Sequence, residues 1–240
     1  LKENQSSFFY NCVSSYAEGL GISTHRYFSL LYIFELASHK GHEYPELKAF
    51  IPGCLSLFYQ ENENNHHLRL LDFPLVNDVK NKPRIYHWNF SGKPSLLHFG
   101  FEGMAPLFFQ GVHQGGFSFS LHHKPGEQFL FEGHSIFHIF FDSLFNSLSL
   151  EDFKKAIRNQ KSISKWGIIL GDEKGEVLEF DCEGHSLHKK VYDLQNHGPF
   201  IFSNIPLKHG HSYSSDHLIS ISHLREMKAK IITEAFLKKE

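Results

Sequence analysis

The segment from Gly53 to Phe73 constrains the fold more than any other part of this sequence. It consists of an apolar run, a polar reversal rich in Asn and Glu, and a second apolar run, which is the pattern of a β-hairpin. A Pro-Gly pair stands directly before Cys54 and would end any preceding element. Because the start of one hairpin strand faces the end of the other, we expect Cys54, Arg69 and Asp72 to meet at one end of a sheet.

A thiol, a guanidinium and a carboxylate at one place suggest nucleophilic chemistry. A nearby permanent cation favours the thiolate form of a cysteine. If the chain were cut between Gly53 and Cys54, the new α-amine would titrate at roughly 7.7–8.0 and could accept the thiol proton, with Asp72 holding the ammonium. The same spacing also fits an ordinary hairpin with a buried cysteine and a surface ion pair. Spacing alone leaves both interpretations open.

Composition and charge exclude several functional classes. The chain has 240 residues, of which 41% are hydrophobic and 21% charged, as in soluble globular proteins with a substantial core. A net charge of −2 gives no electrostatic reason to expect nucleic acid or an anionic membrane as a partner. We expect no transmembrane segment and see no signal peptide, although one removed earlier would leave no trace. The compartment, cytoplasmic or exported, is left open.

Cysteine and histidine usage does not predict a metal site. The three cysteines, Cys12, Cys54 and Cys182, are too widely spaced for a disulfide framework or a structural zinc site. The 19 histidines are scattered, and the adjacent pairs would point to opposite faces of a strand. We therefore expect neither a metal nor another cofactor, with a histidine-rich metal-binding protein as a remote alternative.

Hydrophobic periodicity predicts a layered α+β fold. Alternating or continuous apolar runs predict further strands over 84–90, 96–101, 117–122, 164–170 and 176–181. The glycines of 111–116 predict a tight turn. Helical spacing predicts helices over 23–39, 135–145, 149–159 and 216–240. Successive hairpins indicate antiparallel sheets, and the separate helical blocks indicate helices packed on them.

The first 53 residues contain too few elements to fold alone. We therefore predict that residues 1–53 form a helical prosegment, or small α chain, packed on a single domain over 54–240. The abundance of phenylalanine, 25 residues in all, indicates an aromatic core. Part of this phenylalanine could instead line a pocket for an apolar group, with Phe108, Phe109, Phe117 and Phe119 as the candidates.

The hairpin resembles the start of the cysteine N-terminal nucleophile (Ntn) hydrolases of the choloylglycine hydrolase, acid ceramidase and penicillin acyltransferase group. Members of that group begin with Cys-Thr-Ser and continue, after a short turn, with His-Gly-Arg-Asn-Leu-Asp-Phe or -Tyr. Here the segments read Cys54-Leu55-Ser56 and His67-Leu68-Arg69-Leu70-Leu71-Asp72-Phe73. The spacing from Arg to Asp is kept, whereas Leu55 and Leu70 depart from the family pattern.

Two later segments extend the resemblance. Gly100 to Gly103 and Gly111 to His122 are similar to the family's Gly-x-x-Gly and its following glycine-rich turn and strand, with His122 (or His123, if the register shifts by one) in place of the family's final Asn. Asn204 matches a family Thr-Asn pair. The resemblance implies that the backbone at His122 and the side-chain amide of Asn204 form an oxyanion hole.

Both matched residues have simpler interpretations. His122 could be a polar residue at a strand end, and Asn204 could be a turn residue before Ile-Pro. The family also has a further active-site arginine. Arg225 is the only arginine after Asn204, but its sequence context does not match and we leave it unassigned.

The resemblance implies a four-layer αββα sandwich with the activity of an amidohydrolase. Such an enzyme would cleave the linear amide C–N bond of a small N-acyl substrate through a thioester on Cys54, without a cofactor. An acyltransferase, or an inactive binding protein on the same scaffold, remains an alternative because Leu55, Leu70 and His122 depart from the pattern. The sequence does not identify the acyl group or the leaving group, and it leaves homo-oligomer formation open.

Overall fold

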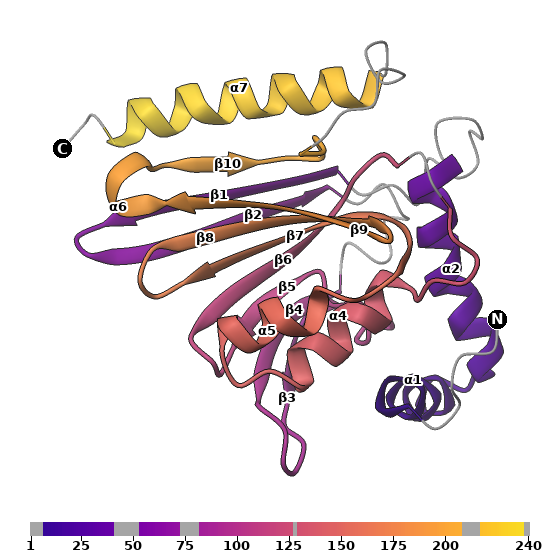
Figure 1. The fold of residues 1–240 in the computed structure, drawn as a ribbon. Coiled ribbons are helices and arrows are strands. Elements are labelled where there is room, and N and C mark those ends of the chain that lie inside the picture. The colour runs from indigo at the N-terminus through magenta and orange to yellow at the C-terminus, as the bar shows by residue number, and fades with distance from the viewer. Residues whose placement is uncertain (1–6, 41–52, 73–81, 127–128, 208–216, 238–240) are drawn as a thin grey trace.

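The computed structural model describes residues 7–40, 53–72, 82–126, 129–207 and 217–237 (Figure 1). Within these residues the helices are α1 (Phe8–Gly19), α2 (Thr24–Lys40), α4 (Ile136–Phe145), α5 (Leu150–Ile157), α6 (Leu194–His197) and α7 (His217–Leu237). The strands are β1 (Gly53–Glu61), β2 (Asn64–Asp72), β3 (Pro83–Trp88), β4 (Leu96–Phe101), β5 (Gln110–His113), β6 (Phe117–His123), β7 (Ser162–Asp172), β8 (Glu176–Gly184), β9 (Ser186–Asp193) and β10 (Phe200–Phe202).

The strands form two antiparallel sheets. A three-stranded sheet has the order β10-β1-β2, and a seven-stranded sheet runs in sequence order from β3 to β9. The hairpin predicted over residues 53–73 is confirmed as β1 and β2, which pair along their full length from Gly53↔Asp72 to Glu61↔Asn64. The late strand β10 returns to pair with β1, opposite Ser56 to Phe58.

The molecule has four layers (Figure 1). Helix α7 covers the three-stranded sheet, this sheet faces the seven-stranded sheet, and α4 and α5 cover the outer face of the latter. The predicted α+β sandwich with α, β, β and α layers is therefore confirmed. Among the described residues, no helix combines the length and the apolar character needed to cross a membrane.

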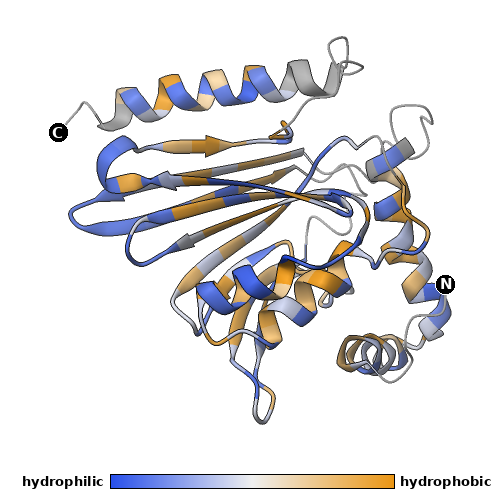
Figure 2. Cartoon of the chain, viewed as in Figure 1, coloured by the Kyte–Doolittle hydropathy of each residue, from blue (hydrophilic) through white to orange (hydrophobic). Residues whose placement is uncertain are grey.

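The main core lies between the seven-stranded sheet and the helices, and it is built largely from phenylalanine. Helix α4 is buried almost throughout and appears as an apolar segment in Figure 2. Phe108, Phe109, Phe117 and Phe119 all belong to this core, and Phe117 also borders the pocket at the hairpin end of the sandwich. Each fully buried Phe contributes roughly 1.5–3 kcal/mol of transfer free energy, which makes this layer the main source of stability.

Two elements of the core were not predicted from the sequence. Helix α1 begins at Ser7, whose side chain accepts a hydrogen bond from the Tyr10 N–H, and it buries Phe9, Val13 and Ala17 at helical spacing. Strand β9 forms the edge of the large sheet. In addition, the turn predicted over 111–116 begins later than expected, because residues 110–113 pair with β4 and β6 as β5.

Glu35 joins α2 to the body of the protein. Its carboxylate is fully buried and accepts hydrogen bonds from four donors: Ser135 Oγ at 2.8 Å, the Ile136 N–H at 2.6 Å, Trp166 Nε1 at 3.1 Å and Ser164 Oγ. Burial raises the pKa of Glu35, and the hydrogen bonds oppose that shift without overcoming it. The first 53 residues thus contribute both apolar and polar contacts to the core.

The space between the two sheets is much more polar than the main core. Along β6, Ser118, Ser120 and His122 alternate on the face toward the three-stranded sheet, where His67 contacts Ser118 and Ser56 contacts the other two. The apolar cluster between the sheets is small, and it consists of Phe58, Ile169, Val177, Leu194 and Phe202. This polar layer holds the residues that the sequence selects as chemically active.

Candidate active site

Strand β1 directs Cys54 into the space between the sheets. Side chains on a strand alternate, and Cys54, Ser56 and Phe58 are the buried set of β1. On β2, Arg69 lies opposite Ser56 in the register, so it shares this inward face. The hairpin therefore brings the thiol and the guanidinium together, as its sequence predicts.

Arg69 is the cation closest to the thiol. Its Nη2 donates to Cys54 Sγ at 3.1 Å and to the Leu121 carbonyl at 2.5 Å, and its Nη1 donates to the Phe109 carbonyl. Burial lowers the pKa of Arg69, and the adjacent sulfur opposes this shift. An arginine remains protonated in proteins, so a buried cation lies in direct contact with the sulfur.

Asn204 lies on the other side of Cys54. Its Oδ1 accepts a hydrogen bond from the Cys54 backbone N–H at 2.8 Å, and its Nδ2 donates to the His123 carbonyl at 2.7 Å. Strand β10 pairs with β1 and so brings the segment after it, with Asn204, beside the start of β1. A residue 150 positions away in the chain thereby fixes the nitrogen of the predicted nucleophile.

Asp72 and Arg225 flank the Gly53–Cys54 peptide. The register places Asp72 directly opposite Gly53, but its side chain lies outside the described part of the structure. A methyl group at Gly53 would lie 2.3 Å from Nη1 of Arg225, so this guanidinium is packed against the glycine. Sequence reasoning left Arg225 unassigned, and only the docking of α7 on the sheet reveals its position.

The imidazole of His122 contacts Ser56 rather than Cys54. The Nε2 of His122 lies 2.7 Å from Ser56 Oγ, and its Nδ1 lies 3.2 Å from the Ser203 carbonyl. Because a carbonyl can only accept, Nδ1 carries the proton and Nε2 accepts the Ser56 hydroxyl. Burial, together with Arg69 and Lys124, lowers the pKa of His122, so the ring is neutral near pH 7.

The backbone N–H of His122 points away from Cys54. The Leu121 N–H donates to the carbonyl of Phe109, the residue before β5, and successive N–H groups along a strand point to opposite edges. The His122 N–H is therefore directed at β7, where His122 pairs with Gly167. The N–H of His123 points to the same edge as the Leu121 and His123 carbonyls, which bind Arg69 and Asn204.

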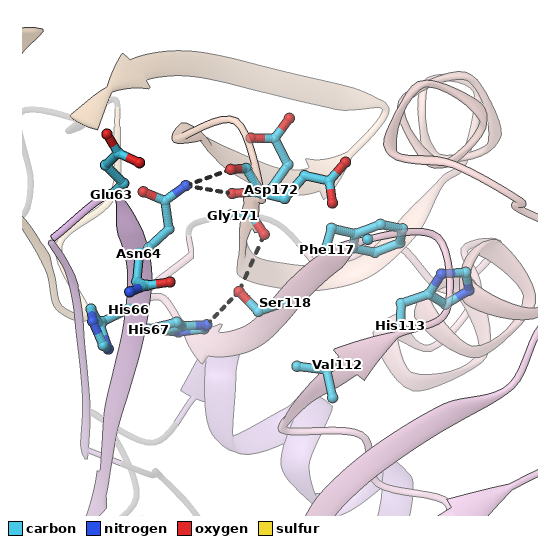
Figure 3. Close-up of a pocket in the computed structure, with 13 residues that line it drawn as sticks. Glu63, Asn64, His66, His67, Val112, His113, Phe117, Ser118, Gly171 and Asp172 are labelled. Atoms are coloured by element: carbon cyan, nitrogen blue, oxygen red, sulfur yellow. Dashed lines mark hydrogen bonds between the residues drawn. The ribbon is translucent and has the colours of Figure 1, made fainter. Parts of the chain in front are cut away.

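A second polar region lies at the hairpin end of the sandwich. A pocket of about 400 Å³ lies there. Figure 3 shows His67 and Ser118 among the residues that line it. The Nδ1 of His67 lies 3.0 Å from Ser118 Oγ, and its ring stacks on Phe58 with a centroid distance of 3.9 Å. This pocket is separated from Cys54 by the length of β1 between residues 54 and 58, and it does not expose the thiol.

The arrangement around Cys54 has the parts of a nucleophilic site. The thiol is 99% buried and has a cation beside the sulfur and an amide oxygen beside the main-chain nitrogen. Of the predicted residues, the structure brings together Cys54, Arg69 and Asn204. The described residues contain no group of three side chains suited to hold a metal ion.

No protein-family model matches the chain, and no curated protein matches it. Among solved structures, the chain is similar to the Caenorhabditis elegans ortholog of N-acylethanolamine-hydrolyzing acid amidase, with 17% identity and a TM-score of 0.46 over 64% of this chain and 70% of that one. It is also similar to penicillin V acylase from Agrobacterium tumefaciens, with 11% identity and a TM-score of 0.42 over 64% of this chain and 53% of the acylase. This chain thus spans about half the length of the acylase.

Proposed function

We propose that this protein is an amidohydrolase that uses Cys54 as its nucleophile after the Gly53–Cys54 bond has been cut. The observation that carries the proposal is the placement of Cys54 between two fixed groups, with Arg69 Nη2 3.1 Å from the sulfur and Asn204 Oδ1 2.8 Å from the nitrogen. A buried structural cysteine does not need a cation at its sulfur, so the contact of Arg69 with the thiol favours a reactive cysteine.

The first proposed step exposes the nucleophile. The Cys54 sulfur attacks the Gly53 carbonyl carbon, the peptide C–N bond breaks, and the departing nitrogen takes the thiol proton. Water then hydrolyses the resulting thioester, which leaves a carboxylate on Gly53 and a free thiol and α-amine on Cys54. The guanidinium of Arg225, packed against Gly53, is suited to stabilise the negative charge that develops at this carbonyl.

The second proposed step is the reaction with substrate. The α-amine accepts the thiol proton, and the sulfur attacks the carbonyl of an N-acyl amide. The tetrahedral intermediate collapses as the C–N bond breaks, and the leaving amine takes the proton held by the Cys54 amine. Water then hydrolyses the acyl thioester to give a carboxylic acid and the free thiol. Arg69 favours the thiolate, and Asp72 is proposed to orient the ammonium.

Oxyanion stabilisation requires a rearrangement of Asn204. Its Nδ2 is bonded to the His123 carbonyl, so the amide must release this partner before it can donate to an oxyanion. We propose that Asn204 holds the Cys54 amine in the resting enzyme. The main-chain N–H of His123 fits the role of oxyanion donor, because it points to the edge of β6 at which Arg69 and Asn204 bind. The N–H of His122 points to the other edge. Loss of one such donor costs about 2.7–4 kcal/mol in similar sites.

Mass spectrometry of the purified full chain tests the proposal. We expect two fragments, the larger beginning at Cys54, and a single uncut chain for Cys54→Ala. The Cys12→Ala variant, which removes a thiol from α1 on the far side of the large sheet, should be cut normally. An uncut wild-type chain whose Cys54 also fails to react with iodoacetamide would contradict the proposal and favour an inactive scaffold.

A substrate screen then separates hydrolase from acyltransferase. The cut protein should release free acid from an N-acyl amino acid, a bile-salt amide, a penicillin or an N-acyl ethanolamine, with a thioester on Cys54 detectable by mass after rapid acid quench. Transfer of the acyl group to an added amine in preference to water would instead identify an acyltransferase. The cut Asn204→Ala protein should keep the thiol reactivity and lose turnover.

A further inference from the structure

A second cavity lies on the opposite side of the large sheet from Cys54. It occupies about 530 Å³ where helix α5 meets the outer strands β8 and β9. The apolar part of its lining comes from Phe180 and Leu187. The polar part is strongly basic, and it consists of Glu151, Lys154, Lys155, Arg158, His185 and Lys189.

The cavity has more positive charge than its own carboxylates can balance. Lys154 is paired with Glu151, the one carboxylate in the lining, and with Glu176, which lies outside the lining, at 2.6 Å. Lys155, Arg158 and Lys189 form no ion pair within the described part of the chain. The whole chain has a net charge of −2, so this is a local concentration of cations on a weakly acidic protein.

Two separate elements present these cations to the same space. On α5, Glu151, Lys155 and Arg158 follow one another at intervals of four and three residues, which puts them on one face of the helix. On β9, Leu187 and Lys189 are two residues apart and therefore point to the same side of the sheet. The apolar and the basic side chains thus line the same cavity.

We propose that this cavity binds a phosphate ester, with the phosphate at Lys155, Arg158 and Lys189 and an apolar part of the ligand against the partly exposed Leu187. A guanidinium can donate two parallel hydrogen bonds to phosphate, and lysines add charge. A volume of this size holds a small molecule or the headgroup of a lipid. The site is separate from Cys54, and the inference does not depend on the proposed hydrolase activity.

Calorimetric titration of the full chain at constant ionic strength tests the site, with inorganic phosphate and a soluble short-chain phosphatidic acid as probes. Both should bind, and Lys155→Gln/Arg158→Gln should weaken binding about tenfold or more, because the phosphate loses two charged donors. Lys228→Gln/Lys230→Gln removes the same charge from exposed positions of α7 and should leave binding unchanged. Lys189→Gln, on the other element, provides an independent check.

Vesicles distinguish a lipid headgroup from a free phosphate compound. If the ligand is a lipid, sedimentation with phosphatidylcholine vesicles should require added phosphatidic acid and should be lost in Leu187→Gln, which keeps the affinity for inorganic phosphate. If the ligand is a soluble ester, the chain should bind the soluble probes and ignore both kinds of vesicle. Absence of binding to every probe, or equal weakening by the α7 control, would overturn the proposal.

Discussion

At the scale of single residues, this protein buries histidines as neutral groups. Burial, reinforced by the charge of Arg69, lowers the pKa of His67 and of His98 to about 3, and burial also lowers the pKa values of His113 and His122. In the unfolded chain these rings would accept protons near pH 6.5. The folded state therefore binds fewer protons than the unfolded state in mildly acidic solution, and its stability must fall as the pH falls.

His67→Gln should make the acid sensitivity of folding shallower. The folded pKa of His67 is depressed to about 3, so its contribution is fully present above about pH 6.5 and is lost progressively as the pH falls toward 3. Between roughly pH 6 and pH 4, the unfolding free energy of the wild type should fall more steeply with falling pH than that of the variant. The difference between the two slopes should reach up to about 1.4 kcal/mol per pH unit. Urea unfolding at several pH values measures this slope. The exposed His25→Gln should leave it unchanged, and identical slopes for His67→Gln and wild type would contradict the prediction.

The residues of the candidate site differ in how far the sequence could predict them. Cys54 and Arg69 belong to one hairpin, whose register follows from two apolar runs and a turn, so their contact is predictable locally. Asn204 was selected through a resemblance, and its contact with the Cys54 nitrogen depends on β10 joining β1. The pairing of His122 with Ser56 could not be predicted, because it arises only where two separate sheets face each other.

At the scale of elements, close approach and buried hydrogen bonds decide where strands and helices pack. Strand β5 illustrates this: the sequence from 111 to 116 reads as a turn because of its three glycines, yet Gly111 is paired on both sides. A side chain there would meet the Leu97 carbonyl oxygen at 2.2 Å and the Phe119 ring at 2.5 Å. The glycine is thus required by the contact with neighbouring strands and not by a turn, a distinction that composition cannot make.

Gly111→Ala should destabilise the large sheet. A backbone carbonyl cannot move away as the end of a flexible side chain can, so we expect a loss of about 1–3 kcal/mol or more in unfolding free energy. Gly19→Ala is the matched control, because no heavy atom lies within 4 Å of a methyl group at that position. Chemical denaturation measures both variants, and a Gly111→Ala protein as stable as the control would show that β4, β5 and β6 are spaced differently.

Glu35→Ala should loosen helix α2 from the sheet. The variant leaves three buried donors, Ser135 Oγ, the Ile136 N–H and Ser164 Oγ, without the Glu35 acceptor, whereas Trp166 Nε1 keeps Ser164 Oγ at 3.0 Å. Each unsatisfied group costs about 1–3 kcal/mol, so we expect a total of at least about 3 kcal/mol. Thermal unfolding and amide exchange within α2 measure the effect. Glu18→Ala, an exposed position on α1, should change stability by less than about 0.5 kcal/mol. Equal effects for the two variants would mean that the hydrogen bonds of Glu35 do not hold α2.

At the scale of the whole molecule, the two interfaces of the sandwich differ in character. The helix-facing side of the large sheet is apolar and could be recognised from its phenylalanines, whereas the space between the sheets is built from serine, histidine, arginine and a buried Lys124–Glu179 pair. Helical spacing of apolar residues predicts the last helix over 216–240, yet the apolar Leu224, Met227 and Ile231 are more than half exposed in α7 while Ser222 and Thr233 are buried. Polar groups inside and apolar groups outside reverse the usual pattern, so periodicity gave the helix but not its orientation.

This distribution of contacts predicts how the chain behaves if it is cut after Gly53. Helices α1 and α2 bury Phe9, Val13, Tyr27, Leu31 and Phe34 in the same core as α4. Separating the two fragments in water would expose these side chains and the Glu35 carboxylate's partners, at a cost of roughly 1.5–3 kcal/mol for each large apolar residue. We therefore expect the two fragments to elute together in native size-exclusion chromatography and to separate only in denaturant.

The matched experiment places a specific protease site in the segment before Gly53, in the Cys54→Ala background, so that cutting no longer depends on the thiol. Proteolysis should leave the elution volume and the circular dichroism unchanged, because the contacts that join α1 and α2 to the sheet are all non-covalent. Release of the small fragment under native conditions would show that residues 1–53 are held mainly by the covalent chain. Retention would make them a structural part of the protein, and we expect their removal to weaken the sheet that contains β6 and the Leu121 carbonyl that accepts from Arg69.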